Sequence, residues 1–187
     1  RIKTFDKLLE NPKSTVEFDE PLAEQIEHRL LTIGADGKLV LTDDGHVYQV
    51  NLLEKLLVPL LSKLGNLVID GGIWMNTQRP EWNDANNALV GNGLSMVTLY
   101  YMRRYVRFLQ KLLANGKETA KLSVELSEWL NETADALQSV SPLLGSDPID
   151  PKLRFGSLVK LGEAASHYRQ KLYARGSFAG KVSQPLS

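Results

Sequence analysis

The sequence predicts a mainly α-helical fold with one β-hairpin near residues 38–50. Apolar residues recur at helical spacing along most of the chain. The only clear β signal is a pair of β-rich runs separated by an Asp-Gly turn. Of the 187 residues, 43% are hydrophobic and 24% are charged, which is ordinary for a globular domain. We therefore expect the whole chain, residues 1–187, to form a single helical domain.

The first long helix is predicted between Asp19 and Gly34. A short apolar cluster at residues 5–9 precedes it and stops at Asn11-Pro12. Asp19 is followed by Glu20-Pro21, an acidic and proline-containing start that is typical of a helix N-terminus. The apolar pattern then continues at helical spacing until Gly34, a residue that commonly ends helices.

The hairpin is predicted where residues 38–42 and 46–50 flank Asp43-Asp44-Gly45. Both runs are rich in β-forming residues, and Asp-Gly favours a tight turn. An isolated hairpin is only marginally stable in water. We therefore expect this one to lie on the helical body.

Two strongly apolar helices follow. Residues 51–64 carry a broad leucine stripe that closes at Gly65. Residues 93–114 are apolar around nearly their whole circumference, which predicts the most buried helix of the fold. Their polar strip contains Arg103, Arg104 and Arg107, which either bind phosphate or a sugar acid or form the solvated edge of the helix.

The C-terminal part predicts two more helices. Thr119 is a suitable cap for an amphipathic helix that Pro142 ends. Asp150-Pro151 starts a final helix that continues to Gly176. The remaining residues, 177–187, are expected to form a frayed tail.

Composition argues against several function classes. The 22 basic residues are balanced by 22 acidic ones, so the basic excess of a nucleic-acid or membrane-surface protein is absent. No apolar run approaches the roughly 18–20 residues needed to span a bilayer. Cysteine is absent, and the three histidines (His28, His46 and His167) lack ligand spacing, so we expect no metal site.

No cofactor motif is found either, neither a glycine-rich phosphate loop nor a dinucleotide fingerprint. The chain opens at Arg1 without a methionine or a signal-peptide pattern, as expected of an excised or processed piece. Two localisations, cytoplasmic or bacterial periplasmic, therefore stay open.

Residues 66–92 are the most informative stretch for function. They contain Trp74, Arg79, Glu81 and Trp82 within a segment of little periodicity, and long irregular segments in compact domains are usually functional. Tryptophan faces stack on the apolar C–H faces of sugars, and Arg, Asn and Asp side chains bind hydroxyl groups. A carboxyl group beside tryptophan has a raised pKa, which suits a general acid. The same residue types are also common in ordinary turns.

The order Glu81-Trp82-Asn83-Asp84-Ala85-Asn86-Asn87 resembles the Trp-Asn-Asp-x-x-Asn segment of inverting cellobiose- and chitobiose-phosphorylase-type enzymes. These enzymes belong to a clan of (α/α)6-barrel glycoside hydrolases and phosphorylases. The resemblance covers residues 71–113. It implies that Asp84 is the general acid, that Trp82 lines the sugar subsite, and that Asn83 and Asn87 hold the loop.

The resemblance also implies an oligosaccharide or disaccharide substrate and a helical, (α/α)-barrel-like fragment. Twelve barrel helices need more residues than this chain has, so we expect the remainder of a longer catalytic chain as a partner. Phosphorolysis would add phosphate as a substrate, whereas hydrolysis needs a second carboxylate. Glu81 and Asp70 are candidates for that carboxylate, which could also lie outside this chain.

One alternative comes from a different function class. The chain could be a non-catalytic helical domain for sugar binding or protein interaction, in which residues 70–92 are a structural loop. Two further possibilities within the enzyme class, hydrolysis and phosphorolysis, stay open because the phosphate-binding elements of the family are not found in the sequence.

Overall fold

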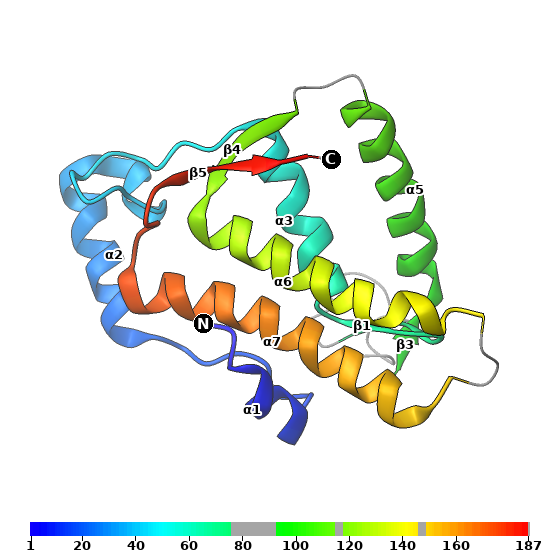
Figure 1. The fold of residues 1–187 in the computed structure, drawn as a ribbon. Helices are drawn as coiled ribbons and strands as arrows, with labels where there is room; N and C mark the ends of the chain where they lie inside the picture. The colour runs from blue at the N-terminus through cyan, green and yellow to red at the C-terminus, as the bar shows by residue number, and fades with distance from the viewer. Residues whose placement is uncertain (76–92, 115–117, 146–148, 187) are drawn as a thin grey trace.

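The structure, a computed structural model, describes residues 1–75, 93–114, 118–145 and 149–186 (Figure 1). It is mainly helical with small antiparallel sheets, which confirms the predicted class. The helices are α1 (Phe5–Glu10), α2 (Glu20–Ile33), α3 (Leu52–Leu64), α5 (Met96–Leu113), α6 (Val124–Val140) and α7 (Pro151–Arg175), with 3-10 turns at Gly34–Lys38 and Ser141–Leu143. The strands β1 (Leu67–Val68), β2 (Gly72–Trp74) and β3 (Leu94–Ser95) form one sheet, and β4 (Thr119–Ser123) pairs with β5 (Lys181–Pro185).

Two predicted helix starts are confirmed by their caps. The Asp19 carboxylate accepts a hydrogen bond from the backbone N–H of Leu22 at 3.1 Å. The Asp150 carboxylate accepts one from Lys152 at 2.9 Å. Each cap satisfies an N–H group that has no partner inside the helix. The glycines predicted to end α2, α3 and α7 occupy the C-cap positions of these helices.

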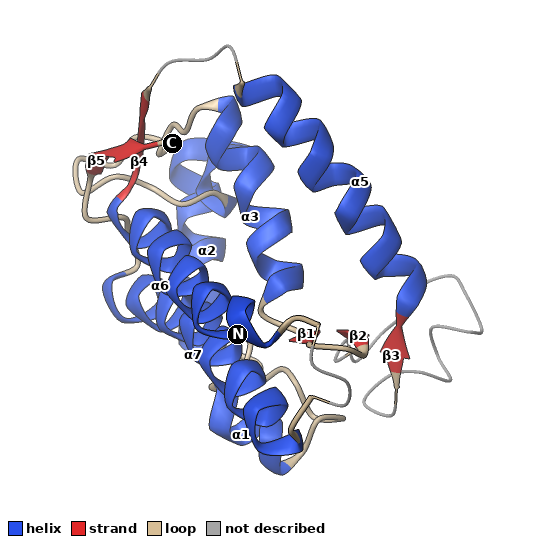
Figure 2. Cartoon of the chain, turned by 45° about the vertical axis from the view of Figure 1, so that its right-hand side comes forward, coloured by secondary structure: helices blue, strands red, loops and turns tan. Residues whose placement is uncertain are grey.

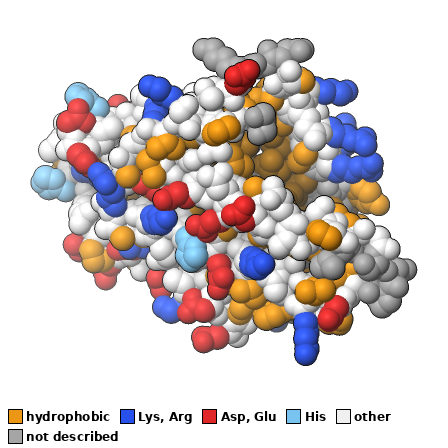
Figure 3. Space-filling model, viewed as in Figure 1, with side chains coloured by type: hydrophobic (Ala, Val, Ile, Leu, Met, Phe, Trp, Pro, Cys, Tyr) orange, Lys and Arg blue, Asp and Glu red, His pale blue; other side chains and the backbone are white. Residues whose placement is uncertain are grey.

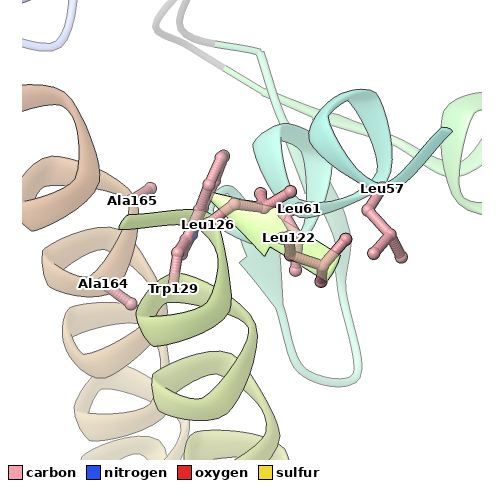
Figure 4. Packing of buried hydrophobic residues seen from close by; sticks show 7 residues of the cluster. All are labelled: Leu57, Leu61, Leu122, Leu126, Trp129, Ala164 and Ala165. Atoms are coloured by element: carbon pink, nitrogen blue, oxygen red, sulfur yellow. The ribbon is translucent and has the colours of Figure 1, made fainter. Parts of the chain in front are cut away.

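The main core lies where α3, β4, α6 and α7 meet. Figure 4 shows its side chains projecting toward one another from these four elements. The central side chains, Leu61, Leu126 and Trp129, are at most 3% exposed. Each buried leucine of this kind contributes about 1.5–3 kcal/mol through removal of apolar surface from water. The other members of the cluster are Leu57, Leu122, Ala164 and Ala165.

Small residues on α7 allow its neighbours to approach closely. A Cβ atom on Gly162 would lie only 2.0 Å from the ring of Phe5, so the absence of a side chain there lets α1 rest on α7. On the same helix, Ala164 and Ala165 face the tryptophan of α6 within the main core. Figure 1 shows α1 and α6 lying beside α7.

The prediction that residues 93–114 form the most buried helix is wrong. In α5, Tyr101 is 64% exposed and Phe108 is 53% exposed, while Met102 and Leu109 are the buried residues. The helix contacts the body from one side, through α3 and β2. Figure 2 shows it along one edge of the molecule, apart from α6 and α7. Within the described chain, no element covers its outer face, and that is why apolar content did not lead to burial.

The contact between α5 and α3 leaves a shallow groove of about 330 Å³. Leu64 of α3 and Leu99, Met102 and Val106 of α5 supply its apolar walls. Figure 3 shows apolar side chains gathered in the hollow between α5 and the packed helices, with basic side chains along the outer edge. Arg103, Arg104 and Arg107 are exposed, as the solvated-edge interpretation predicts.

The two predictions for residues 119–123 and 177–187 are also wrong. Thr119 begins strand β4 rather than a helix, and helix α6 starts only at Val124. The expected frayed tail forms β5, which pairs with β4 in antiparallel register, with Leu122 opposite Val182. Neither strand has a local partner, so only the pairing between distant parts of the sequence stabilises them.

The predicted hairpin near residues 38–50 is present but short. The backbone N–H of Tyr48 donates to Val40 at 3.0 Å, and that of Thr42 donates to His46 at 2.7 Å. The two arms share a single isolated bridge between Leu41 and Val47 rather than a continuous ladder. The first arm is shortened because Gly34–Lys38 forms a 3-10 turn.

Candidate functional site

The ends of the segment predicted to carry chemistry are held by the sheet β1-β2-β3. Trp74 of β2 pairs with Leu94 of β3, and the backbone N–H of Met75 donates to Gly93 at 3.3 Å. Residues 76–92 therefore connect two adjacent antiparallel strands. Six predicted site residues lie outside the described residues: Arg79, Glu81, Trp82, Asn83, Asp84 and Asn87.

The absence of a side chain at Gly72 allows β2 to lie close to β3. The φ angle of this glycine is +143°, a region that other residues rarely adopt. A Cβ atom there would lie 3.2 Å from the sulfur of Met96 and 3.3 Å from the carbonyl oxygen of Ser95. Ser95 then starts α5 directly, because its hydroxyl oxygen accepts a hydrogen bond from the N–H of Thr98 at 3.1 Å.

Trp74 is the one predicted sugar-contact residue that the structure describes. Its backbone N–H donates to the carbonyl of Asn66 at 2.8 Å, and its side chain is half-buried. The preceding Ile73 is 1% exposed and anchors the strand in the body. Trp74 therefore has a fixed backbone and a partly accessible ring at the base of the segment, and its contact with a sugar stays a prediction.

Asp70, a candidate second carboxylate, lies at the turn between β1 and β2. It has a φ angle of 60°, and its exposed carboxylate lies 3.3 Å from the guanidinium of Arg154 on α7. Exposed pairs of this kind contribute at most about 1 kcal/mol to stability. The pair orients the carboxylate on the side of the sheet that faces α7.

A small apolar cluster connects this sheet to the helices. It consists of Ile69, Val140 and Ile149, with Leu67 packed against it. Val140 ends α6, and Ile149 precedes α7, so the sheet sits where these two helices meet. This packing gives the base of residues 76–92 a defined position at one end of the helical body.

Sequence analysis missed a second polar region, around Glu54 of α3. Glu54 is only 2% exposed, and its carboxylate accepts hydrogen bonds from the backbone N–H of Ser123, at 3.0 Å, and from the Ser123 hydroxyl. The Tyr48 hydroxyl lies 3.1 Å from the same serine oxygen. The burial of Glu54 could have been predicted from the sequence, because Glu54 shares a helix face with Leu57 and Leu61.

A second buried carboxylate belongs to this region. Glu125 is 5% exposed and accepts a hydrogen bond from the N–H of Ala179 at 2.8 Å. Burial, and then the nearby charges of Glu54 and Glu125, raise the pKa of the Tyr168 phenol to about 12. The carboxylates bind backbone N–H groups of β4 and of the segment before β5. We interpret them as connections that join the two-stranded sheet to the helices.

No family model matches this chain, and no curated protein sequence is similar to it. Among the described residues, no group of three or more histidine, aspartate or glutamate side chains is arranged to hold a metal ion. None of the described helices combines the length and apolar character needed to cross a membrane. The functional assignment therefore depends on the order of residues 81–87 and on the position of their segment in the fold.

Proposed function

We propose that this chain is part of a carbohydrate-active catalytic region that cleaves a glycosidic bond, with Asp84 as the general acid. The observation that carries the proposal is the order Trp82-Asn83-Asp84, followed by Asn87, which resembles inverting disaccharide phosphorylases and the related (α/α)6-barrel hydrolases. In this proposal the described helices are part of such a barrel, and further helices come from the remainder of a longer chain.

The described structure supports the proposal in one respect. The sheet holds the two ends of residues 76–92 side by side at one end of the helical body, with the half-buried ring of Trp74 at the base. A segment whose two ends are held on adjacent strands can position catalytic side chains more accurately than a segment whose ends lie far apart. Trp74 and Arg79 would then contact the sugar next to Trp82.

The chemistry divides the roles among the residues. Asp84 donates a proton to the glycosidic oxygen as the bond from this oxygen to the anomeric carbon breaks. The new bond to that carbon forms from water in hydrolysis and from phosphate in phosphorolysis. Water requires a second carboxylate as a base, about 6.5–9.5 Å from the acid, for which Glu81 and Asp70 are the candidates. Phosphate requires no such base.

The test is an assay of the complete gene product with β-linked disaccharides of glucose and of N-acetylglucosamine. Asp84→Asn preserves the shape of the side chain but removes the proton, so turnover should fall by about 10²–10⁴-fold. Aryl glycosides with good leaving groups should retain much more activity, because they need less protonation. Asp135→Asn, an exposed site on α6, is the matched control and should leave turnover unchanged.

Phosphate distinguishes the two reactions. Cleavage that requires phosphate and produces a sugar phosphate identifies phosphorolysis, and cleavage without phosphate identifies hydrolysis. If Asp84→Asn turns over a natural disaccharide as fast as the unmodified protein, then Asp84 is not the acid and the proposal is wrong.

A second candidate function is a non-catalytic helical domain for sugar binding or protein interaction. The exposed apolar side of α5 favours it, because contiguous apolar surface often marks a contact with another protein segment. This candidate predicts that the complete protein binds sugars or a protein partner without cleaving any glycoside. It also predicts that Asp84→Asn leaves such binding intact.

A further inference from the structure

A cavity of about 840 Å³ lies between the N-terminal segment and the packed helices, and its wall includes Asn66, which directly precedes β1. Its walls include Phe5 and Leu8 of α1, Trp129 of α6, and Tyr168 and Arg169 of α7. Figure 1 shows α1 lying against α7 in this region. Sites for small molecules commonly have about 300–1,000 Å³ and mostly apolar walls with a few polar groups. This cavity has that size, and its walls combine apolar side chains with polar residues such as Thr15, Ser62 and Asn66.

Arg169, a half-buried residue in this wall, forms no ion pair with another described residue. The ion pairs between described residues involve other arginines, such as Arg154 with Asp70 and Arg175 with Asp43, and none includes Arg169. Burial lowers the pKa of Arg169, and only the Tyr173 phenol acts in the opposite direction. Buried charges are normally paired, because removing an ion from water is unfavourable. An unpaired cation in a cavity wall therefore indicates an anion that comes from outside.

A second unpartnered donor lies in the same wall. Trp129 is 3% exposed and stacks on Tyr168 with ring centroids 4.5 Å apart, but its indole N–H has no acceptor among the described residues. The Nε atom of Arg169 is also buried without a partner. The two outer nitrogens of Arg169 are not among these buried, unpartnered atoms. Most buried donors in proteins have acceptors, and the other unpartnered buried atoms among the described residues belong to Arg29, Glu125 and Arg154.

We propose that this cavity binds a small organic molecule whose oxyanion, a carboxylate or a phosphate, pairs with Arg169 and whose apolar body lies between α1 and Trp129. The planar guanidinium matches both oxyanions in a two-point hydrogen-bonded pair. The apolar body would lie in the cavity whose walls include Phe5, Leu8 and Trp129, which are themselves at most 6% exposed. The exposed Lys63 at the rim adds a second positive charge.

The test compares four probes that share one apolar body and differ in charge. Phenylbutyrate, phenylbutyl phosphate, phenylbutanol and phenylbutylamine are titrated into the 187-residue chain in a calorimeter. Both anions should bind about tenfold or more tightly than the alcohol, as expected for one charge-assisted hydrogen-bonded pair, and the amine should bind weakest. The tighter of the two anions identifies the preferred oxyanion. Equal binding of the alcohol and both anions would overturn the proposal.

Substitutions at Arg169 test whether this residue causes the tighter binding of the anions. Arg169→Gln should weaken anion binding about tenfold or more and leave alcohol binding unchanged, and Arg169→Lys should recover part of the loss. Arg104→Gln changes an exposed arginine on α5 and is the matched control, so it should change neither affinity. Equal losses in Arg169→Gln and Arg104→Gln would show a diffuse charge effect and would contradict the proposal.

Thermal unfolding separates a ligand-binding arginine from a structural one. Because the charge is unpaired without ligand, Arg169→Met should unfold at the same temperature as the unmodified chain or at a higher one. An anionic probe should raise the unfolding temperature of the unmodified chain but not that of Arg169→Met. If Arg169→Met instead unfolds at a lower temperature and loses alcohol binding as well, then the arginine supports the fold and the proposal is wrong.

Discussion

Helices α6 and α5 have similar lengths, and α5 has more large apolar residues than α6, yet α6 is the more buried of the two. On α6, Leu126 and Trp129 are at most 3% exposed because α3 and α7 cover them. On α5, Tyr101 and Phe108 are more than half exposed, although the sequence of α5 is the more aromatic. The comparison teaches that apolar content shows what a helix can bury, whereas its neighbours decide what it does bury.

The difference also concerns residue size. The neighbour of α6 is α7, whose small residues Ala164 and Ala165 pack with Leu126 and Trp129 of α6 in the main core. The described neighbours of α5 are α3 and β2, and they reach only one side of it. If the chain belongs to a longer protein, as we propose, then the exposed side of α5 is available for helices of the remainder.

The largest effect is expected from a matched pair of leucine truncations. Leu126→Ala in α6 should lower the free energy of unfolding by about 2–5 kcal/mol, because it leaves a cavity in the main core. Leu112→Ala in α5 should change it by less than about 0.5 kcal/mol, because Leu112 is 49% exposed. Urea titration of the 187-residue chain measures both values. Similar losses in the two variants would mean that α5 is covered in solution, and a dependence on protein concentration would identify a second copy as the cover.

An intermediate effect is expected from two glycines of α7. Gly162→Ala would place a methyl group against the ring of Phe5, so it should lower the free energy of unfolding by about 1–3 kcal/mol. Gly156→Ala meets no atom within 4 Å and should instead raise stability by about 0.5–1 kcal/mol, because alanine favours the helix. The same titration measures both. A neutral Gly162→Ala would show that α1 is not held against α7.

The smallest expected effect is a change of stability at high pH. The pKa of Tyr168 is raised from 10.0 to about 12 by burial and by the neighbouring carboxylates. The neutral phenol is therefore favoured in the folded state, and its contribution to stability is complete below pH 10 and is lost as the pH rises toward about 12. Tyr168→Phe should flatten the pH dependence of the unfolding free energy in this range.

The control for this measurement is Tyr101→Phe on the exposed side of α5, which should leave the decline above pH 10 in place. The absorbance of the tyrosinate ions, followed as the folded chain is titrated, gives an independent reading. If Tyr168→Phe and the unmodified chain lose stability in parallel, then Tyr168 is accessible to solvent, and α6 and α7 are packed less tightly than described.

The sequence predicted most of the helical elements but little of the candidate sites. The start of α2 at Asp19 and that of α7 at Asp150 were predictable, because a cap and the helix it begins are neighbours in the chain. The resemblance around Asp84 was also visible in the sequence, and the role of Asp84 stays a prediction. Arg169 carried no signal in the sequence, because whether an arginine forms an ion pair depends on contacts between distant parts of the chain, and no ion pair between described residues includes it.

What the sequence determined by itself is local. Helix class, helix ends and the turn near Gly45 follow from hydrogen bonds and apolar periodicity among residues a few positions apart. What only the tertiary structure decided is which surfaces meet. The pairing of β4 with β5, the burial of Glu54 against Ser123 and the exposure of α5 each depend on contacts between distant parts of the chain. Such contacts arise only when folding brings these parts together, so local sequence patterns do not predict them directly.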